Sequence, residues 1–184
     1  MLDVGSHNGD SAEDLMDFYN HKIEHIYCVE ANFENLLHLI NFRNSHQKYL
    51  EKITLVSAAL GDKNEFAIMQ GSEETSHVGN FNTKSEVHSK QMVIPACTFD
   101  SYFTNMGINL IKMDIEGYEL NAIKGAEKYI RERAPYMAIA VYHKPTDIYA
   151  IPNKILEINP GYTFILRLYS ECLEELVLYC IPNS

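Results

Sequence analysis

Short hydrophobic runs alternate with amphipathic stretches through the first third of the chain. The runs at 1–4, 25–29 and 53–57 are short and apolar and predict strands. Between them, hydrophobic residues recur at helical spacing and predict helices over 11–20 and 33–46. This alternation is typical of a parallel sheet with helices on both faces.

The rest of the chain continues this pattern and then changes it. Further hydrophobic runs predict strands at 65–69, 91–95, 109–113, 136–142, 162–169 and 174–181. Helical spacing predicts helices near 98–105, around 123–130 and over 153–159. Only a short polar turn separates the last two strands, so they are expected to pair antiparallel. We therefore predict an α/β fold with a mainly parallel seven-stranded sheet and a C-terminal antiparallel hairpin.

The composition is that of one globular domain. The chain has 184 residues and 46% hydrophobic content, which is enough to bury a core, so we expect a single domain spanning 1–184. The sequence Leu2-Asp3-Val4-Gly5 begins directly in the first strand. Domains seldom start this way, and we expect that an N-terminal segment of a longer chain is missing.

Charge and cysteine content narrow the class of partner and the compartment. The net charge of −10 disfavours nucleic acid or an anionic membrane, because both need a basic face. No apolar run approaches the roughly 20 residues of a membrane span, and no signal peptide opens the chain. The cysteines show no metal or disulfide spacing and predict reduced core thiols of a cytoplasmic protein: Cys28, Cys97, Cys172 and Cys180.

A glycine loop joins the first strand to the first helix. Glycines here let the backbone approach a ligand, and the helix start offers unpaired N–H groups. The dinucleotide pattern would place a glycine at position 7, but His7 would obstruct a pyrophosphate. S-adenosyl-L-methionine (AdoMet) has no pyrophosphate, and its methionine end fits such a loop. The residues expected to bind it are Asp3, Gly5, Ser6, Asn8 and Gly9.

The next two strand ends offer partners for the nucleoside. Glu30, with Ala31 beside it, ends the second strand, where a carboxylate can accept both ribose hydroxyls. A helix-start charge is the alternative explanation of Glu30. The small residues Ser57, Ala58 and Ala59 end the third strand and would let an adenine lie against the backbone, although packing explains them equally well.

Three acidic residues follow the strand at 109–113. Asp114, Glu116 and Glu119 would be costly to bury without a purpose. Asp114 and Glu116 are candidates for holding the AdoMet amino group, orienting an acceptor hydroxyl or binding a metal. Helix-start capping is the alternative, and it suits Glu119 best.

With these segments in view, the chain resembles the FkbM family of AdoMet-dependent methyltransferases. The specific block is IKMDIEGYE, in order behind LDVGSHNGD; further matching stretches are CVEAN, SAALGD, TFDSY, and the tail from AVYHKPTD to LYCIP. The resemblance implies a Rossmann-like class I methyltransferase fold and O-methylation, often of hydroxyls on sugars or natural products. It thus implies a small-molecule or carbohydrate acceptor.

His143 is the candidate catalytic base. It follows the strand at 136–142, and its imidazole would accept the proton of the acceptor hydroxyl, with Asp114 as a possible helper. A hydrogen-bonded structural histidine is the alternative. Arg167 and Tyr169 on the final hairpin are candidates for touching the acceptor. The polar stretch 71–89 lacks apolar periodicity and is expected to form a mobile loop over the acceptor site.

Three other functions remain open at this stage. A nicotinamide-dependent oxidoreductase would use a similar sheet, but the loop and the hairpin disfavour it. A non-catalytic AdoMet-binding module is the second. A metal-dependent transferase with Asp114, Glu116 and His143 as ligands is the third. We hold the metal-dependent reading as a minor alternative and assign no metal ligands in the main interpretation. We make no prediction of the oligomeric state.

Overall fold

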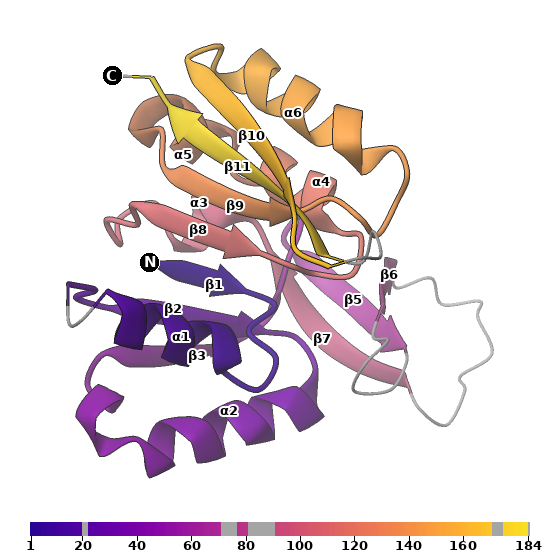
Figure 1. Ribbon diagram of the computed structural model, residues 1–184. Helices are drawn as coiled ribbons and strands as arrows, with labels where there is room; N and C mark the ends of the chain where they lie inside the picture. Colours follow the sequence, from indigo (N-terminus) through magenta and orange to yellow (C-terminus); the bar gives the residue numbers. More distant parts are fainter. Residues whose placement is uncertain (20–21, 71–76, 81–90, 171–174, 184) are drawn as a thin grey trace. The chain divides into compact units, whose positions relative to one another are not determined.

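The computed structural model describes residues 1–19, 22–70, 77–80, 91–170 and 175–183 (Figure 1). Its main sheet has seven strands and is mainly parallel, which confirms the predicted α/β fold class. The chain divides into two compact units. The first unit comprises residues 1–59 and 65–96, and the second comprises residues 60–64 and 97–184.

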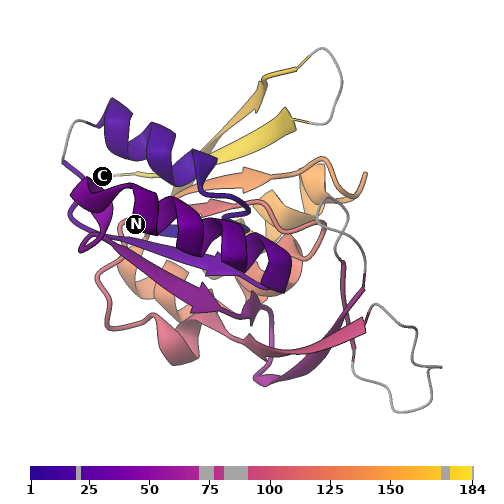
Figure 2. The same ribbon diagram turned by 90° about the horizontal axis from the view of Figure 1, so that it is seen from below.

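The first unit contributes three parallel strands to the main sheet, in the order β1-β2-β3. The strands are β1 (Leu2–Val4), β2 (Ile26–Glu30) and β3 (Ile53–Ser57), and the helices are α1 (Asp10–Phe18), α2 (Phe33–Ser45) and the short 3-10 helix η1 (Gln47–Tyr49). Helix α2 lies along β2 and β3 (Figure 2). Because Ala12 and Met16 recur on one face of α1, both are buried in the same cluster as Leu39 of α2 and Ile26 of β2.

A second, antiparallel sheet has the strand order β4-β7-β5-β6. Its strands are β4 (Ala59–Leu60), β5 (Glu65–Gln70), β6 (His77–Asn80) and β7 (Gln91–Cys97). The sequence predicts β5 and β7 but not β6, which lies inside the stretch 71–89 that we expected to be a loop. Backbone pairing with β5, not a side-chain pattern, makes this segment a strand. The rest of that stretch lies outside the described residues.

The second unit contributes four strands, in the order β10-β11-β9-β8. They are β8 (Leu110–Met113), β9 (Tyr136–Ala140), β10 (Tyr162–Leu168) and β11 (Leu176–Pro182), and the helices are α3 (Phe99–Tyr102), α4 (Glu119–Lys124), α5 (Glu127–Arg133) and α6 (Asp147–Ile158). Strands β8 and β9 are parallel, whereas β11 is antiparallel to both β9 and β10. The predicted C-terminal hairpin is therefore confirmed.

Two helix predictions in this unit need correction. The helix expected around 123–130 is two helices, with the break after Lys124. The helix expected over 153–159 begins at Asp147 and contains Pro152. Proline removes one backbone hydrogen bond, but burial of Ile151 and Ile155 on the inner face outweighs that loss.

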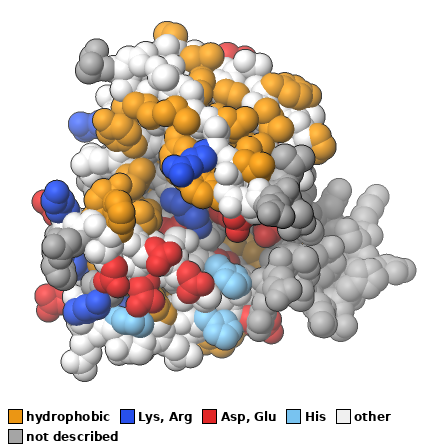
Figure 3. Space-filling model, viewed as in Figure 1, with side chains coloured by type: hydrophobic (Ala, Val, Ile, Leu, Met, Phe, Trp, Pro, Cys, Tyr) orange, Lys and Arg blue, Asp and Glu red, His pale blue; other side chains and the backbone are white. Residues whose placement is uncertain are grey.

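Acidic and hydrophobic side chains are unevenly distributed over the surface of the described residues (Figure 3). Acidic side chains gather over α1, whose sequence includes Asp10, Glu13, Asp14 and Asp17, while hydrophobic side chains gather over the C-terminal hairpin, where Ile165 is about half exposed. The described cysteines, Cys28, Cys97 and Cys180, are buried. Within the ranges described above, none of the helices has the length and hydrophobicity that crossing a membrane requires.

Candidate functional site

The loop after β1 is built by backbone hydrogen bonds. Gly5 has a φ of 78°, and its N–H donates to the Val29 carbonyl at 2.9 Å. The Ser6 hydroxyl donates to the Asp3 carbonyl at 2.8 Å, and both side chains are buried. The loop therefore turns back on β1 and is joined to β2 by its first amides.

The end of the loop requires a glycine. Gly9 has a φ of 99°, and a Cβ there would lie 2.6 Å from the Phe42 ring. Asn8, just before it, donates from Nδ2 to Asp10 at 2.8 Å. The close contact between Gly9 and α2 fixes where α1 begins, so the loop is held at both ends.

Glu30 lies at the centre of the expected cofactor site. Its side chain is 7% exposed; Oε2 accepts the His7 N–H at 2.9 Å, and Oε1 accepts the Asn32 N–H at 2.7 Å. Burial raises the pKa of Glu30, and backbone N–H groups of Asn32, His7 and Ala31 oppose that rise in part. A carboxylate offers about four acceptor positions, so acceptor capacity remains for a ligand.

Asn32, and not Glu30, supplies the side-chain cap of α2. Asn32 is the N-cap, and its side chain accepts from the N–H groups of Glu34 at 2.8 Å and Asn35 at 3.3 Å. Asn is a preferred N-cap residue, so its position between Glu30 and the hydrophobic helix positions was a readable signal that the sequence analysis missed.

The small residues expected near the adenine have different environments. Ser57 is exposed at the end of β3, opposite Glu30 in the parallel register. Ala58 is buried, and Ala59 belongs to a hydrophobic cluster against which Ala31 packs. Packing therefore accounts for Ala31 and Ala59, whereas Ser57 remains available to a ligand.

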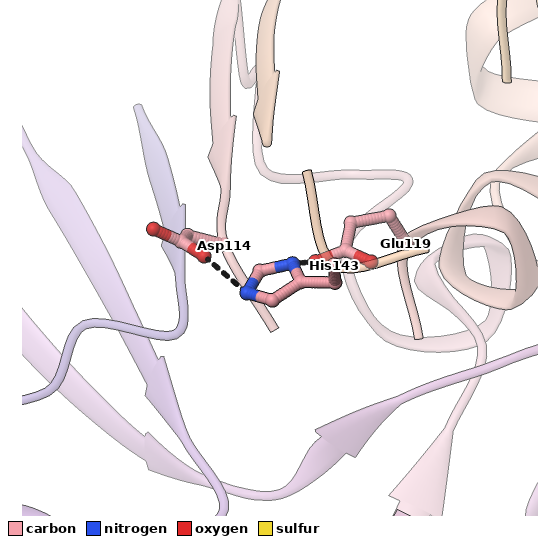
Figure 4. A group of neighbouring side chains, drawn as sticks. All are labelled: Asp114, Glu119 and His143. Atoms are coloured by element: carbon pink, nitrogen blue, oxygen red, sulfur yellow. Dashed lines mark ion pairs between the residues drawn. The ribbon is translucent and has the colours of Figure 1, made fainter. Parts of the chain in front are cut away.

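The second unit brings a histidine and several carboxylates together. Asp114 follows β8, Glu119 begins α4, and His143 follows β9. Figure 4 shows the imidazole of His143 between Asp114 and Glu119, with one ring nitrogen directed at each carboxylate. The parallel pairing of β8 with β9 places these segments side by side.

The contacts of His143 differ between its two nitrogens. Nδ1 lies 3.0 Å from Oε1 of Glu119. Nε2 lies 3.5 Å from Oδ1 of Asp114 and 3.5 Å from Oε2 of Glu116. The Tyr142 hydroxyl donates to Asp114 at 3.2 Å, so Asp114 has a neutral donor as well. The short contact is the one with Glu119, and the Nε2 contacts are longer than a hydrogen bond.

These contacts shift the proton affinities of the group. Burial alone would lower the pKa of His143, but the hydrogen bond to Glu119 and the charges of Asp114 and Glu116 outweigh it, so the pKa is raised. Burial alone would raise the pKa of Glu119, but His143 and the Ile115 N–H lower it below its usual value. Glu119 is therefore ionised at neutral pH.

The contacts of Glu119 go beyond the helix-start capping that its sequence position suggests. Its side chain is fully buried, and Oε1 accepts the N–H groups of Ile115 at 2.9 Å and Gly117 at 3.3 Å. These donors belong to the loop before α4, so the carboxylate serves the loop and His143. The cluster of three acidic residues in six positions was the available signal.

The donor atoms of Asp114, Glu119 and His143 lie within 4.8 Å of one another, a spacing at which one cation can be shared. A protonated imidazole supplies positive charge at the same position. When it is protonated, His143 therefore gives the acidic residues a counter-charge within the chain itself.

The expected binding residues thus form two groups, one in each unit. The first unit holds the loop residues Asp3, Gly5, Ser6, Asn8 and Gly9 together with Glu30, Ala31, Ser57, Ala58 and Ala59; the second unit holds Asp114, Glu116 and His143. On β10 and just after it, the Arg167 guanidinium lies 4.7 Å from the centre of the Tyr169 ring, so these two side chains contact each other.

Comparison with known proteins decides the family. The profile of the methyltransferase FkbM domain matches residues 3–172. The chain belongs to the FkbM methyltransferase family. No curated protein matches the sequence. The predicted family is confirmed, and the match supports AdoMet as the cofactor.

Solved structures agree with this assignment. The FkbM methyltransferase from Methylobacillus flagellatus KT is 28% identical, with a TM-score of 0.81 over 98% of this chain and 43% of that one. The precorrin-6y C5,15-methyltransferase from Geobacter metallireducens GS-15 has a TM-score of 0.54 at 12% identity, over 100% and 79% of the two chains. The FkbM chain described here thus spans less than half the length of its Methylobacillus relative.

A third similar structure carries a bound ligand. A candidate methyltransferase from Streptococcus mutans, solved in complex with SAH, has a TM-score of 0.51 at 15% identity, over 97% of this chain and 86% of that one. At this identity, and at that of the Geobacter protein, the likeness shows that the fold is shared.

Proposed function

We propose that this chain transfers the methyl group of AdoMet to a hydroxyl oxygen of a sugar or a small natural-product-like acceptor. The observation that carries the proposal is His143, whose Nδ1 is engaged by buried Glu119 while Nε2 points at Asp114 and Glu116. Methyl transfer to an alcohol releases a proton, and a histidine held this way is a suitable acceptor for it.

The first unit supplies the groups that AdoMet requires. Backbone N–H groups at the start of α1, with Asp3, Ser6 and Asn8 around them, suit the methionine carboxylate and amino group. Glu30 has free lone pairs for the ribose hydroxyls, and Ser57 lies at the neighbouring strand end. Burial of Glu30 makes its remaining acceptor capacity valuable to a ligand.

The second unit supplies the groups for the acceptor. The acceptor oxygen attacks the methyl carbon, the bond from that carbon to sulfur breaks, and its electron pair stays on sulfur to give S-adenosylhomocysteine. The hydroxyl proton passes to Nε2 of His143, with Asp114 assisting. Asp114 and Glu116 are 37% and 42% exposed, so their carboxylates are open to a hydroxyl or to an amino group of a ligand. The sulfonium is reactive by itself, and alignment supplies much of the rate.

The direct test of this proposal is methyl transfer from AdoMet to a panel of methyl glycosides, followed by mass spectrometry of the products. We expect a methylated hydroxyl on at least one glycoside, and calorimetry is expected to show binding of AdoMet but not of NAD. Binding of NAD in preference to AdoMet would favour the oxidoreductase alternative. AdoMet binding without transfer to any hydroxyl would favour the alternative of a non-catalytic AdoMet-binding module.

Glu30→Ala is expected to weaken AdoMet binding tenfold or more. Hydrogen bonds to a charged group contribute about 1.5–3 kcal/mol each, and the substitution removes those to the ribose. Calorimetric titration with AdoMet measures the effect. Glu30→Gln is expected to be milder, because an amide oxygen still accepts. Glu34→Ala is the matched control, since Glu34 is an exposed glutamate close by on α2. Unchanged affinity in a folded Glu30→Ala variant would remove Glu30 from the ribose site.

A further inference from the structure

The contacts of Glu119 indicate which ring nitrogen of neutral His143 carries the hydrogen. Oε1 of Glu119 accepts two backbone N–H groups and belongs to a carboxylate whose pKa is lowered, so it is ionised and can only accept. Nδ1 of His143 lies 3.0 Å from this oxygen. Two acceptors cannot share that contact without a proton. This close ion pair with an acceptor-only oxygen favours a hydrogen on Nδ1.

We infer that Glu119 is a positioning residue that holds neutral His143 as its Nδ1–H tautomer, so that Nε2 keeps the lone pair that receives the acceptor's proton. The tautomer is inferred from the contacts and charge of Glu119, whereas the use of Nε2 rests on the proposed function. A carboxylate that orients a catalytic imidazole through its other nitrogen is a recurrent arrangement in enzymes that use histidine as a base.

The loop before α4 is built to hold Glu119 in this position. Gly117 donates its N–H to Oε1, and its carbonyl accepts from Nζ of Lys144, which follows His143 directly. Gly117 has a φ of 87°, and a Cβ there would lie 3.0 Å from Cε of Lys144. The loop is thus bound to Glu119 through the Gly117 N–H and to Lys144, the residue after His143, through the Gly117 carbonyl. This double attachment fixes the distance between the carboxylate and the imidazole.

Other titratable groups lie around His143 without contacting Nδ1. Asp114 and Glu116 face Nε2 from the loop after β8, Tyr142 is its neighbour on the strand side, and Lys144 follows it. Asp147, at the start of α6, is 2% exposed and acts on the group by charge. Among the described residues around this imidazole, Glu119 is the carboxylate that forms an ion pair with Nδ1.

The imidazole nitrogen chemical shifts of His143 in the full chain test the tautomer without any ligand. In the unmodified protein above the pKa of His143, we expect Nδ1 to be protonated and Nε2 to be unprotonated. In Glu119→Gln, the amide can donate to Nδ1, and we expect the population to move toward the Nε2–H tautomer. A neutral His143 that carries its proton on Nε2 in the unmodified protein would overturn the inference, and this measurement needs no variant to fold.

Kinetics with a methyl glycoside that the enzyme accepts test the consequence for catalysis. Glu119→Gln is expected to lower kcat by about 10²–10⁴-fold with little change in KM, because the Nε2 lone pair of His143 is no longer held available to the acceptor, whereas the binding groups are unchanged. The acid limb of its pH profile is expected to move to lower pH, because a negative neighbour of His143 is gone. Glu119→Asp keeps the carboxylate and is expected to recover part of the rate. An unchanged pH profile and kcat in Glu119→Gln would contradict the role.

Asp147→Asn is the matched control. Asp147 is another buried carboxylate of the same region, but it is not the partner of Nδ1. We expect this variant to keep the wild-type tautomer, and a tautomer change equal to that of Glu119→Gln would contradict the inference. The inference and the proposed function can fail separately. The expected tautomer together with no transfer to any hydroxyl would overturn the function and leave the positioning by Glu119 in place.

Discussion

Replacing His143 by alanine is expected to lower turnover by about 10²–10⁴-fold while AdoMet affinity stays nearly unchanged. An alcohol is a poor nucleophile until its proton is removed, and Nε2 of His143 is the base that we assign to that step. Steady-state kinetics with a methyl glycoside acceptor and calorimetric titration with AdoMet measure the two quantities. His38→Ala is the control, because His38 is an exposed histidine on α2.

The pH dependence gives an independent check on the same residue. The base form of His143 is unprotonated, and its carboxylate neighbours raise its pKa above the usual 6.5. The value of kcat/KM is therefore expected to fall as the pH decreases through a value above 6.5. A purely structural histidine would behave differently. His143→Ala would then lower the melting temperature and keep full activity per folded molecule, which would remove His143 from the mechanism.

Gly125→Ala is expected to destabilise the fold by about 3 kcal/mol or more, because overpacking against backbone cannot be relieved by a side-chain movement. Gly125 ends α4 with a φ of −73°, so alanine suits its backbone conformation. A Cβ there would, however, lie 1.9 Å from the carbonyl oxygen of Gly61 and 3.3 Å from Cβ of Thr98. The loss of unfolding free energy is therefore steric in origin, and the clash lies at the end of α4, the helix that begins with Glu119.

Unfolding in urea, followed by far-ultraviolet circular dichroism, measures this effect. Gly107→Ala is the matched control, because a Cβ at Gly107 meets nothing within 4 Å and only its φ of 61° opposes the change. We expect a cost of about 1 kcal/mol for that control. A Gly125→Ala protein as stable as the control would show that the chain relaxes at this contact.

Local patterns were sufficient for most of the fold. Hydrophobic spacing predicted the strands of the main sheet, and the short turn before the last strand predicted the antiparallel hairpin, because each element must bury its own apolar face. Where the pattern was weak, prediction failed. The segment His77–Asn80 has no apolar periodicity and is a strand only through pairing with β5. The helix expected over 153–159 begins at Asp147, and burial of Ile151 and Ile155 carries α6 through Pro152.

The candidate site divides in the same way. The sequence by itself determined the glycine loop, Glu30, the acidic block, His143 and the family, because these are residue types at fixed positions relative to strand ends. Only the tertiary structure decided that Glu119, and not Asp114, makes the short contact with His143, at 3.0 Å against 3.5 Å. That choice depends on how the loop before α4 folds beside β9, and hydrogen bonds between segments distant in sequence leave no periodic trace in either one.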